Sequence, residues 1–250
     1  MQEEKGMPGY YDIHSHILPG IDDGPAALPQ ALELAAAYVA DGAAGLVATP
    51  HYVMGMGIAE FLRRRQEALD SLMRGLREKG IDLSIKLGAE VSMIPKEKGS
   101  SSYREIEENA QSLCLGDTNL MLVEYPAGPE PVWFEESIYR LQKMNVQPVL
   151  AHAERYGWLK NKKRLAKLID KGAYLQVNAG SLRGLFTPYR GFAKELLGSD
   201  YVHFVATDSH DARRRRPKMS CLSKGRIFWH LDNSKALFGH KGEHIFYVSL

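Results

Sequence analysis

The feature that most constrains the fold is a repeated order of one short apolar run and one longer amphipathic segment. The runs have the character of buried strands and lie at residues 10–13, 45–48, 83–87, 119–123, 148–151, 173–177 and 203–206. Segments with helical periodicity follow most of them, at residues 27–42, 59–80, 131–145, 161–172 and 188–200. This alternation predicts an α/β fold of about seven βα units, with a parallel sheet that is either open and doubly wound or closed into a barrel.

The length of 250 residues fits one domain of this kind, and we expect a single domain over 1–250. Two segments depart from the alternation. Residues 94–118 form a polar excursion, which we expect to be an insertion with a short helix. From about residue 212 the sequence is only weakly periodic, and we expect one or two helices there.

Charge and cysteine content narrow the class of protein. The chain has 32 basic and 30 acidic residues and a net charge of +2, which gives no reason to expect a nucleic-acid partner. Cys114 and Cys221 lie far apart and outside any CxxC motif, which favours a reducing compartment. The first residues resemble no signal peptide, and no apolar run is long enough to span a bilayer. We expect a soluble cytoplasmic protein.

Metal-binding side chains follow almost every expected strand. They are His14, His16, His51, Glu90, Glu124, His152, Asp208 and His210. Because the carboxyl ends of parallel barrel strands share one face, we expect these residues to converge. A lone histidine is more often structural, and we interpret His203, His230, His240 and His244 in that way. The combined set instead predicts a metal site.

The ligand types indicate the chemistry of this site. Imidazole and carboxylate without thiolate suit manganese, iron, cobalt or zinc in a hydrolytic centre, whereas a structural zinc site would use cysteine. The number of candidates exceeds the need of one ion, which predicts two or three ions and a bridging carboxylate. Neighbouring cations would acidify a bridging water and neutralise a phosphoryl or acyl group. The sequence therefore predicts a metal-dependent hydrolase.

Several motifs also carry a family resemblance. DIHSHILPGIDDG, ATPHY, GAEV, LVEYP, AHAERY, NAGSLRG and ATDSHDARRRRP occur in this order between about residues 12 and 217. Together they resemble the polymerase and histidinol phosphatase (PHP) superfamily. More closely, they resemble the bacterial manganese-dependent protein tyrosine phosphatases of capsular and exopolysaccharide operons, the CpsB/CapC/YwqE type. The resemblance implies a distorted seven-stranded, TIM-like (β/α)7 barrel and a tyrosine phosphatase that uses two or three ions, with Mn²⁺ first.

The resemblance also implies how the ligands divide among three ions. One ion would be held by His14, His16, Glu90 and Asp208. Glu90 would bridge to a second ion, held also by Glu124 and His152. A third would be held by Asp22, His51 and His210. Asp22 has a structural alternative, because the Asp-Asp-Gly sequence also favours a tight turn. Asp12 is expected to support the ligands rather than to bind an ion.

Two arginine positions are implied to bind substrate. Arg155 would lie at the mouth of the site, where a guanidinium can contact two phosphate oxygens, and its alternative is an ordinary surface arginine. Arg216 matches the family's second arginine. The run Arg213–Arg216 nevertheless leaves the register open, because any of the four could meet phosphate or the run could be a solvated loop.

The implied reaction is direct attack of metal-bound hydroxide on phosphorus, stabilised by the metals and by arginine. A protonated Asp208 or His210 could assist the leaving group. Neither cysteine lies in the Cys-x5-Arg loop of thiol phosphatases. The implied substrate is the phosphotyrosine-rich tail of a polysaccharide-synthesis tyrosine kinase, which Arg213–Arg216 could attract.

Two other functions compete with this one. One is a different PHP phosphomonoesterase, acting on histidinol phosphate or on a small sugar or nucleotide phosphate. The other is a non-catalytic metal-binding PHP module, which the presence of every expected ligand disfavours. Residues 218–250 do not resemble the family's usual closing helices, so the packing of this segment and any oligomer contacts are left open.

Overall fold

The computed structural model describes residues 9–94, 101–183, 188–199, 201–222, 233–234 and 237–238. All seven expected strands are present. They are β1 (Tyr10–Ser15), β2 (Ala43–Ala48), β4 (Ser84–Leu87), β6 (Leu120–Glu124), β7 (Gln147–Leu150), β8 (Tyr174–Asn178) and β9 (Phe204–Ala206). The five expected helices are α1 (Leu28–Ala40), α2 (Ile58–Lys79), α4 (Phe134–Lys143), α5 (Lys162–Asp170) and α7 (Arg190–Gly198).

Two helix ends illustrate how local sequence sets these boundaries. The Asn161 side chain accepts hydrogen bonds from the backbone N–H groups of Lys163 and Arg164 and so caps the start of α5. Gly80 ends α2 in the left-handed conformation, with φ 64°, which a residue without Cβ adopts easily. Both helices therefore begin or end where the sequence offers the matching residue.

Two short strands were not expected from the sequence. Strands β3 (His51–Val53) and β5 (Glu90–Ser92) follow β2 and β4 after brief interruptions. Backbone hydrogen bonds continue across both gaps, from Gly88 N–H to the Ala48 carbonyl (2.9 Å) and from Glu90 N–H to the Pro50 carbonyl (3.1 Å). β3 and β5 therefore extend the preceding strands toward the candidate site.

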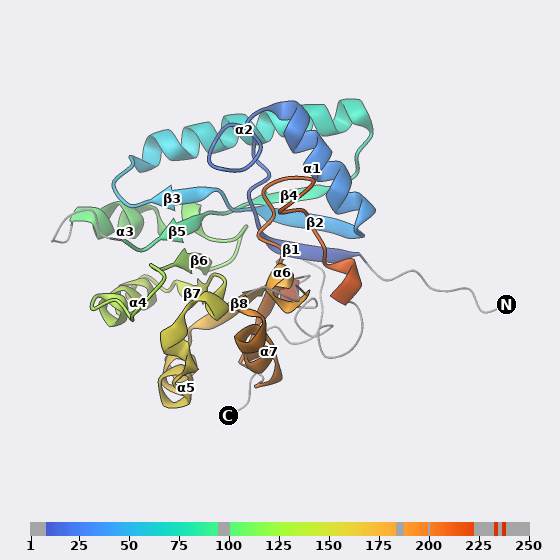
Figure 1. Ribbon diagram of the computed structural model, residues 1–250. Helices are drawn as coiled ribbons and strands as arrows, with labels where there is room; N and C mark the ends of the chain where they lie inside the picture. The colour runs from blue at the N-terminus through green and yellow to red at the C-terminus, as the bar shows by residue number, and fades with distance from the viewer. Residues whose placement is uncertain are drawn as a thin grey trace.

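The strands pair in parallel in two sheets, β1-β2-β4 and β3-β5-β6-β7-β8-β9 (Figure 1). Since β3 extends β2 and β5 extends β4, the two sheets form one continuous order around the molecule. The first and last strands meet at their carboxyl ends, where Asp208 N–H bonds to the His14 carbonyl (3.0 Å) and His16 N–H bonds to the Ser209 carbonyl (2.9 Å). This arrangement confirms the predicted α/β fold with distorted, barrel-like parallel strands.

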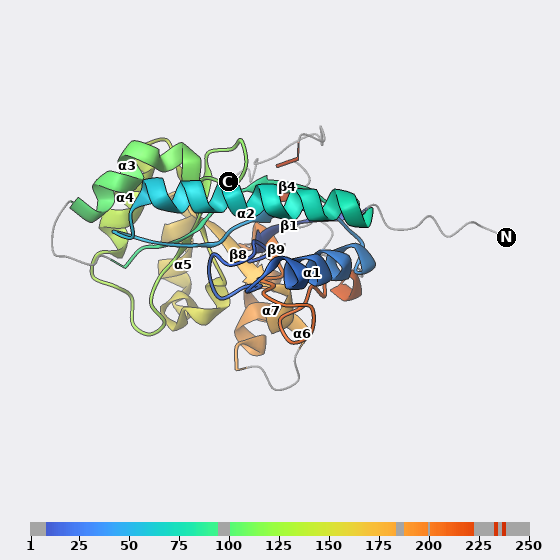
Figure 2. The same ribbon diagram turned by 90° about the horizontal axis from the view of Figure 1, so that it is seen from above.

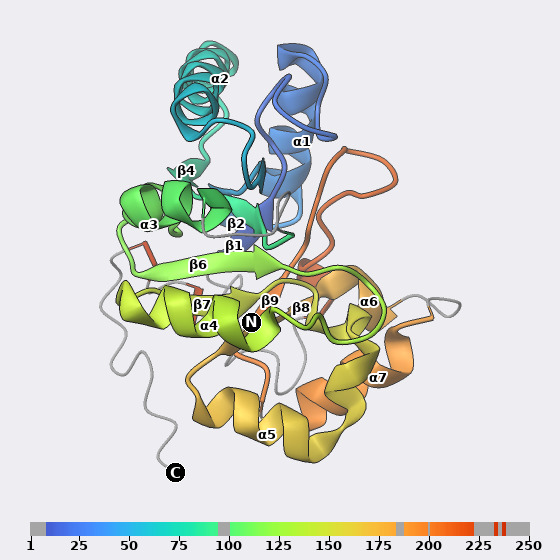
Figure 3. The same cartoon turned by 90° about the vertical axis from the view of Figure 1, so that its left-hand side faces the viewer.

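Helices cover the outside of the strands. α1 and α2 lie side by side over β1, β2 and β4, whereas α4, α5 and α7 lie on the other side of the molecule (Figures 1 and 3). Figure 2 looks down on α2 and α1 from outside. A large apolar cluster fills the space between helices and strands, and a smaller one gathers on the inner face of the strands. The smaller cluster includes Ile13, Val47, Leu122, Val149 and Phe204.

The alternation of side chains along each strand explains how polar residues come to lie above this inner apolar layer. Leu120 and Leu122 of β6 belong to the inner cluster, and Glu124 is the next residue on the same face. Phe204 of β9 is followed in the same way by Asp208 after the strand ends. The inner face therefore changes from apolar to ionisable toward the carboxyl ends of the strands.

The two irregular segments are described in part. The polar excursion contains helix α3 (Ser101–Leu113), while residues 95–100 lie outside the described part. Beyond residue 212 the structure describes the short 3₁₀ helix η3 (Ser220–Leu222), and the expectation of further helices falls largely on residues that it does not describe. No helix in the described ranges combines the length and the apolar character needed to cross a membrane.

Asp12 joins three parts of the fold and is fully buried. Its Oδ1 accepts hydrogen bonds from the backbone N–H groups of His14 (3.2 Å) and Thr207 (3.1 Å). Its Oδ2 accepts from the Tyr38 hydroxyl (2.8 Å) and from the Thr207 hydroxyl. The carboxylate thus ties β1 to helix α1 and to the segment after β9, as expected for a supporting residue.

We expect Asp12→Ala to lower the free energy of unfolding by about 2–4 kcal/mol, because buried donors lose their acceptor. Urea denaturation in the presence of EDTA would measure this loss without a contribution from metal binding. Asp117→Ala is the matched control, since Asp117 is 93% exposed and pairs with Lys86 at the surface. The control should cost less than about 1 kcal/mol, and equal losses in the two variants would contradict the assigned role of Asp12.

Candidate metal centre

The structure brings the strand-end residues together at one end of the molecule. His14 and His16 come from β1 and the residue after it, His51 begins β3, Glu90 begins β5 and Glu124 ends β6. His152 follows β7, and Asp208 and His210 follow β9. Eight side chains that are distant in the sequence therefore face one another, as the parallel topology predicts.

Glu90 lies at the middle of this group and is 1% exposed. Its Oε2 lies 3.3 Å from Nε2 of both His14 and His16 and 3.1 Å from Nδ1 of His51. Its Oε1 lies 2.8 Å from Nε2 of His152. One buried carboxylate therefore contacts four imidazoles, and its expected role as a bridge between two cations stays a prediction.

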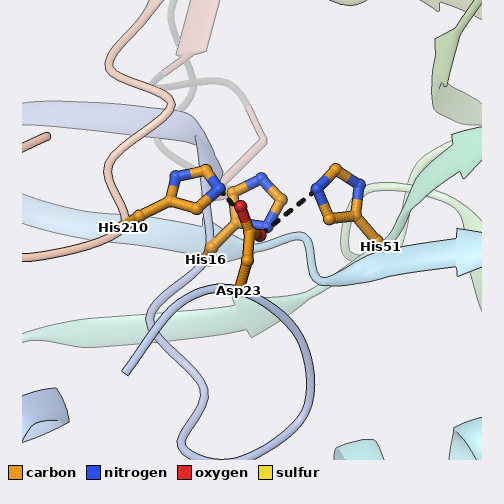
Figure 4. Close-up of side chains that lie close together, drawn as sticks. All are labelled: His16, Asp23, His51 and His210. Atoms are coloured by element: carbon orange, nitrogen blue, oxygen red, sulfur yellow. Dashed lines mark ion pairs between the residues drawn. The ribbon is translucent and has the colours of Figure 1, made fainter. Parts of the chain in front are cut away.

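Within the described residues, three sets of side chains place their ligand atoms close enough to share an ion. The sets are His14, His16 and Asp208; His51, Glu90 and Glu124; and His16, Asp23, His51 and His210. In each set the atoms lie within 4.8 Å of one another. The last set is drawn in Figure 4, where Asp23 Oδ1 lies between His210 Nε2 (3.1 Å) and His51 Nε2 (3.4 Å).

Asp22 and its neighbour Asp23 occupy different places. Asp22 Oδ2 lies 2.7 Å from Nδ1 of His16 and accepts the backbone N–H of His51 at 3.1 Å. Asp22 Oδ1 accepts the N–H of Gly24 at 3.0 Å, which is a turn contact. Asp22 therefore contacts the Nδ1 atom of His16, whereas the carboxylate of Asp23 contacts the imidazoles of His51 and His210. Ligation by Asp22 stays a prediction, and Asp23 is a candidate that the motif did not single out.

The surroundings shift the pKa values of these groups in different directions. Burial opposes protonation of His16, but hydrogen bonds with Asp22 and Glu90 raise its pKa to about 10. Burial and the neighbouring Glu90 charge raise the pKa of Glu124 to about 7. Burial and the nearby His16 lower the pKa of His210 to about 4. Against the effect of burial, Glu90 and Asp208 also raise the pKa of His14, so protons compete with cations at His14, His16 and Glu124.

The residues present fit divalent cations. The buried Nε2 of His210 is one of the polar atoms that make no hydrogen bond within the described chain, although Asp23 lies nearby. Such an atom costs about 1–3 kcal/mol when it stays unpaired, and a cation would satisfy it. The donor set of imidazole nitrogens and carboxylate oxygens suits manganese, iron, cobalt or zinc. The residues thus suit a metal centre, and binding of two or three ions stays a prediction.

Two site residues have backbone conformations that disfavour side chains. His152 has φ 36° and Asp208 has φ 54°. Both values lie in the left-handed region, which costs on the order of 1–3 kcal/mol for a residue other than glycine. Each of these residues lies two positions beyond the end of a strand, where the chain turns toward the candidate centre. Such strained positions are common at functional sites, where the surrounding structure holds them.

Arginines approach Asp208 from two directions. Arg155, in the 3₁₀ helix η1 (Ala153–Arg155), donates from Nη2 to Asp208 Oδ2 at 2.8 Å. Arg215 donates from Nη2 to Asp208 Oδ1 at 3.1 Å and from Nη1 to Asp23 at 3.3 Å. The Asp211 carboxylate accepts the backbone N–H groups of residues 213, 214 and 215 and so folds the arginine run into a turn. This turn directs Arg215 to the centre.

A cavity of about 610 Å³ opens beside Asp208. Its lining includes Arg155, Ala179, Tyr189, Arg214, Arg215 and Arg216. Arg216 therefore lies at the cavity wall with Arg155, while Arg215 is the member of the run that touches Asp208. Substrate binding by Arg216 stays a prediction. The cavity joins basic groups and an aromatic ring directly next to the candidate centre.

The chain is similar to known proteins over most of its length. It is 35% identical to the tyrosine-protein phosphatase YwqE of Bacillus subtilis, over 82% of this chain and 78% of that protein. It is 32% identical to the tyrosine-protein phosphatase CpsB of Streptococcus pneumoniae, over 83% of this chain and 86% of that protein. A solved structure from work on YwqE and CpsB, described there as unique metal-dependent tyrosine phosphatases, superposes with a TM-score of 0.78 at 30% identity. The superposition covers 94% of this chain and 96% of that one.

The family model described as capsular polysaccharide synthesis, CpsB/CapC, matches residues 10–238. This range contains all the strands in the described part of the chain and every residue of the candidate centre. The chain therefore belongs to the CpsB/CapC family.

Proposed function

We propose that this protein is a metal-dependent protein tyrosine phosphatase. The observation that carries the proposal is the contact of Glu90 with four histidines, next to a cavity lined by Arg155 and Arg215. A centre for several cations beside guanidinium groups suits hydrolysis of a phosphate ester. The family and the activities named for YwqE and CpsB support the same reaction.

The cations and the side chains of the protein have different roles in the proposed reaction. Manganese or a similar cation, when bound, supplies an acidified water as nucleophile and offsets the charge of the phosphoryl group. Arg155 binds the phosphate, because a guanidinium pairs well with two phosphate oxygens and this side chain is 34% exposed toward the cavity. Arg215 and Arg216 can reach the same anion from the other wall. Asp208 holds Arg155 and Arg215 until substrate arrives.

The electrostatics favour an aryl ester. Burial opposes ionisation of Asp208, but the charges of His14 and His16 keep its pKa low, and the pKa of His210 is about 4. Without a cation both groups therefore favour the deprotonated form at neutral pH, which argues against either as a general acid, and help to the leaving group by Asp208 or His210 stays a prediction. A phenolate, whose conjugate acid has a pKa of about 10, leaves with little such help, whereas an alkoxide does not. Phosphotyrosine is therefore a better substrate than phosphoserine.

The natural substrate that we infer is a phosphotyrosine-rich tail of a polysaccharide-synthesis tyrosine kinase. The family description concerns capsular polysaccharide synthesis. Residues Arg213–Arg216 are exposed, the last three of them line the cavity, and the run would attract a flexible anionic segment. A cytoplasmic location fits this substrate, and the buried free thiol of Cys114 is compatible with a reducing compartment.

Hydrolysis of a phosphotyrosine peptide should require added Mn²⁺ after treatment with EDTA. His152→Ala should lose activity together with bound metal. Arg155→Ala should lose about 100-fold in kcat/KM with its metal content unchanged, because it removes phosphate binding while Asn178 and Arg215 still hold Asp208. Arg104→Ala, on the exposed side of α3, is the matched control and should retain full activity.

Two results would contradict the proposed reaction. Reconstituted protein that is inert toward p-nitrophenyl phosphate would indicate a non-catalytic metal-binding module. A clear preference for histidinol phosphate or a sugar phosphate over the peptide would indicate another phosphomonoesterase of the superfamily.

Tyr189 should contribute to binding of the aromatic ring. It is 37% exposed and lines the cavity with Pro188 and Ala179. We expect Tyr189→Ala to lower kcat/KM for p-nitrophenyl phosphate about fivefold, as for loss of one aromatic contact. Inhibition by inorganic phosphate, which has no ring, should not change. Tyr139→Ala, an exposed tyrosine of α4, is the control, and a parallel change in phosphate inhibition would argue against a ring subsite.

Metal affinity should rise with pH. Without a cation the pKa of Glu124 is about 7 and that of His16 about 10, so protons must leave before these groups can bind an ion. We expect apparent Mn²⁺ affinity to be at least about tenfold weaker near pH 6 than near pH 8. Calorimetry in two buffers of different ionisation enthalpy would detect the released protons. Equal affinity at the two pH values would contradict the assignment of these groups as ligands.

A further inference from the structure

Strand β8 provides none of the predicted ligands, yet two of its side chains reach three of the ligand residues. Gln176 is fully buried and Asn178 is 6% exposed. They are two residues apart and therefore share the inner face of the strand. β8 pairs with both β7 and β9, which lead to His152 and Asp208. The two amides thus lie on the inner face of the strands, next to the candidate centre.

The first contact fixes the orientation of the Gln176 amide. The backbone N–H of His152 donates to Gln176 Oε1 at 2.8 Å, and a peptide N–H can only donate. The atom facing it must therefore be the amide oxygen. The same oxygen lies 3.1 Å from Nδ1 of His14, so this ring nitrogen must carry a hydrogen and donate. Nε2 of His14 is the nitrogen left to face Glu90 and Asp208.

The orientation of the Gln176 amide in turn determines that of the Asn178 amide. Gln176 Nε2 donates to Asn178 Oδ1 at 2.7 Å, which leaves the Asn178 nitrogen to donate to Asp208 Oδ2 at 2.8 Å. Asp208 Oδ2 also accepts from Arg155 at 2.8 Å. Its other oxygen, Oδ1, accepts from Arg215 and lies 3.5 Å from His14 Nε2 and 3.6 Å from His16 Nε2. Oδ1 is therefore the oxygen turned toward the ligand histidines.

The backbone of Asn178, within this chain of hydrogen bonds, is also held by Glu154. The buried Glu154 carboxylate accepts the backbone N–H of Asn178 at 3.2 Å and the hydroxyl of Ser181 at 2.6 Å. Glu154 precedes Arg155, the residue expected to bind phosphate. The strand, the amides and the arginine-bearing turn are therefore held in one hydrogen-bonded unit.

We infer that Gln176 and Asn178 are positioning residues that form a directional amide relay. The relay selects the form of His14 with hydrogen on Nδ1, so that Nε2 can bind a cation, and it presents Oδ1 of Asp208 to the same centre. This inference rests on the proposed metal-dependent function. It adds the prediction that β8 sets metal affinity without contacting metal, which is the usual role of groups that hydrogen-bond to ligands.

Three variants of the full chain separate the parts of the relay. Gln176→Leu removes every contact. Gln176→Glu keeps the acceptor for His152 and His14 but cannot donate to Asn178. Asn178→Asp keeps the acceptor for Gln176 but cannot donate to Asp208. Gln111→Leu, at an exposed glutamine that bonds the Thr118 carbonyl, is the matched control.

Two readouts test the relay independently of activity. Free Mn²⁺ measured by electron paramagnetic resonance gives metal affinity and stoichiometry. We expect Gln176→Leu to bind Mn²⁺ about 10–100-fold more weakly, Gln176→Glu and Asn178→Asp to show intermediate losses, and Gln111→Leu to match the wild type. Nitrogen NMR of the zinc-loaded protein should find the His14 hydrogen on Nδ1 in the wild type and in Gln176→Glu.

The relay would be overturned by wild-type Mn²⁺ affinity in folded Gln176→Leu, or by hydrogen on Nε2 of His14 in the loaded wild type. If Gln176→Leu does not fold, unchanged affinity in both Gln176→Glu and Asn178→Asp overturns it. Failure of the proposed function is a different result. It would be wild-type protein that binds Mn²⁺ through the same relay but does not hydrolyse a phosphotyrosine peptide.

Discussion

The contact of one buried carboxylate with four imidazoles is the constraint on which the rest of this structure depends. An isolated charge at the position of Glu90 would be costly, because burial removes its hydration. The imidazoles offset that cost, but they come from three places in the chain: the end of β1, the start of β3 and the segment after β7. The parallel order, the junction between β1 and the segment after β9, and the strained backbone at His152 and Asp208 all bring these groups to one point. The architecture and the candidate centre are therefore two aspects of one arrangement.

Much of this arrangement could be predicted from the sequence, because it follows from local patterns and one rule of topology. Apolar runs marked all seven principal strands, and an ionisable residue after a strand identified most of the converging side chains. The two short strands β3 and β5 were missed because their apolar pattern is brief and interrupted. They need hydrogen-bond partners on neighbouring strands to be recognisable, and those partners are distant in the sequence.

The roles of several other residues could not be predicted from local sequence patterns, because they too depend on the folded path of the chain. Two adjacent carboxylates, Asp22 and Asp23, have the same composition and spacing, and only the path of the turn decides which one reaches His51 and His210. Arg215 is distinguished from its neighbours only by the turn that Asp211 builds. Gln176 and Asn178 look like ordinary polar strand residues until the groups above them are known. In each case a long-range contact, rather than residue type, assigns the role.

The junction between the first strand and the segment after the last one has a consequence for how the protein acquires its cations in the cell. His14 and His16 are synthesised early, whereas Asp208 and His210 are synthesised late, and hydrogen bonds between His14, His16, Asp208 and Ser209 join the two segments. A nascent chain that has not yet emerged as far as residue 210 lacks Asp208 and His210, so two of the three ligand sets are then incomplete. We therefore expect the full set of ions to bind only after the segment that follows β9 has joined β1, so that the folded protein and the ion pool around it select the metal.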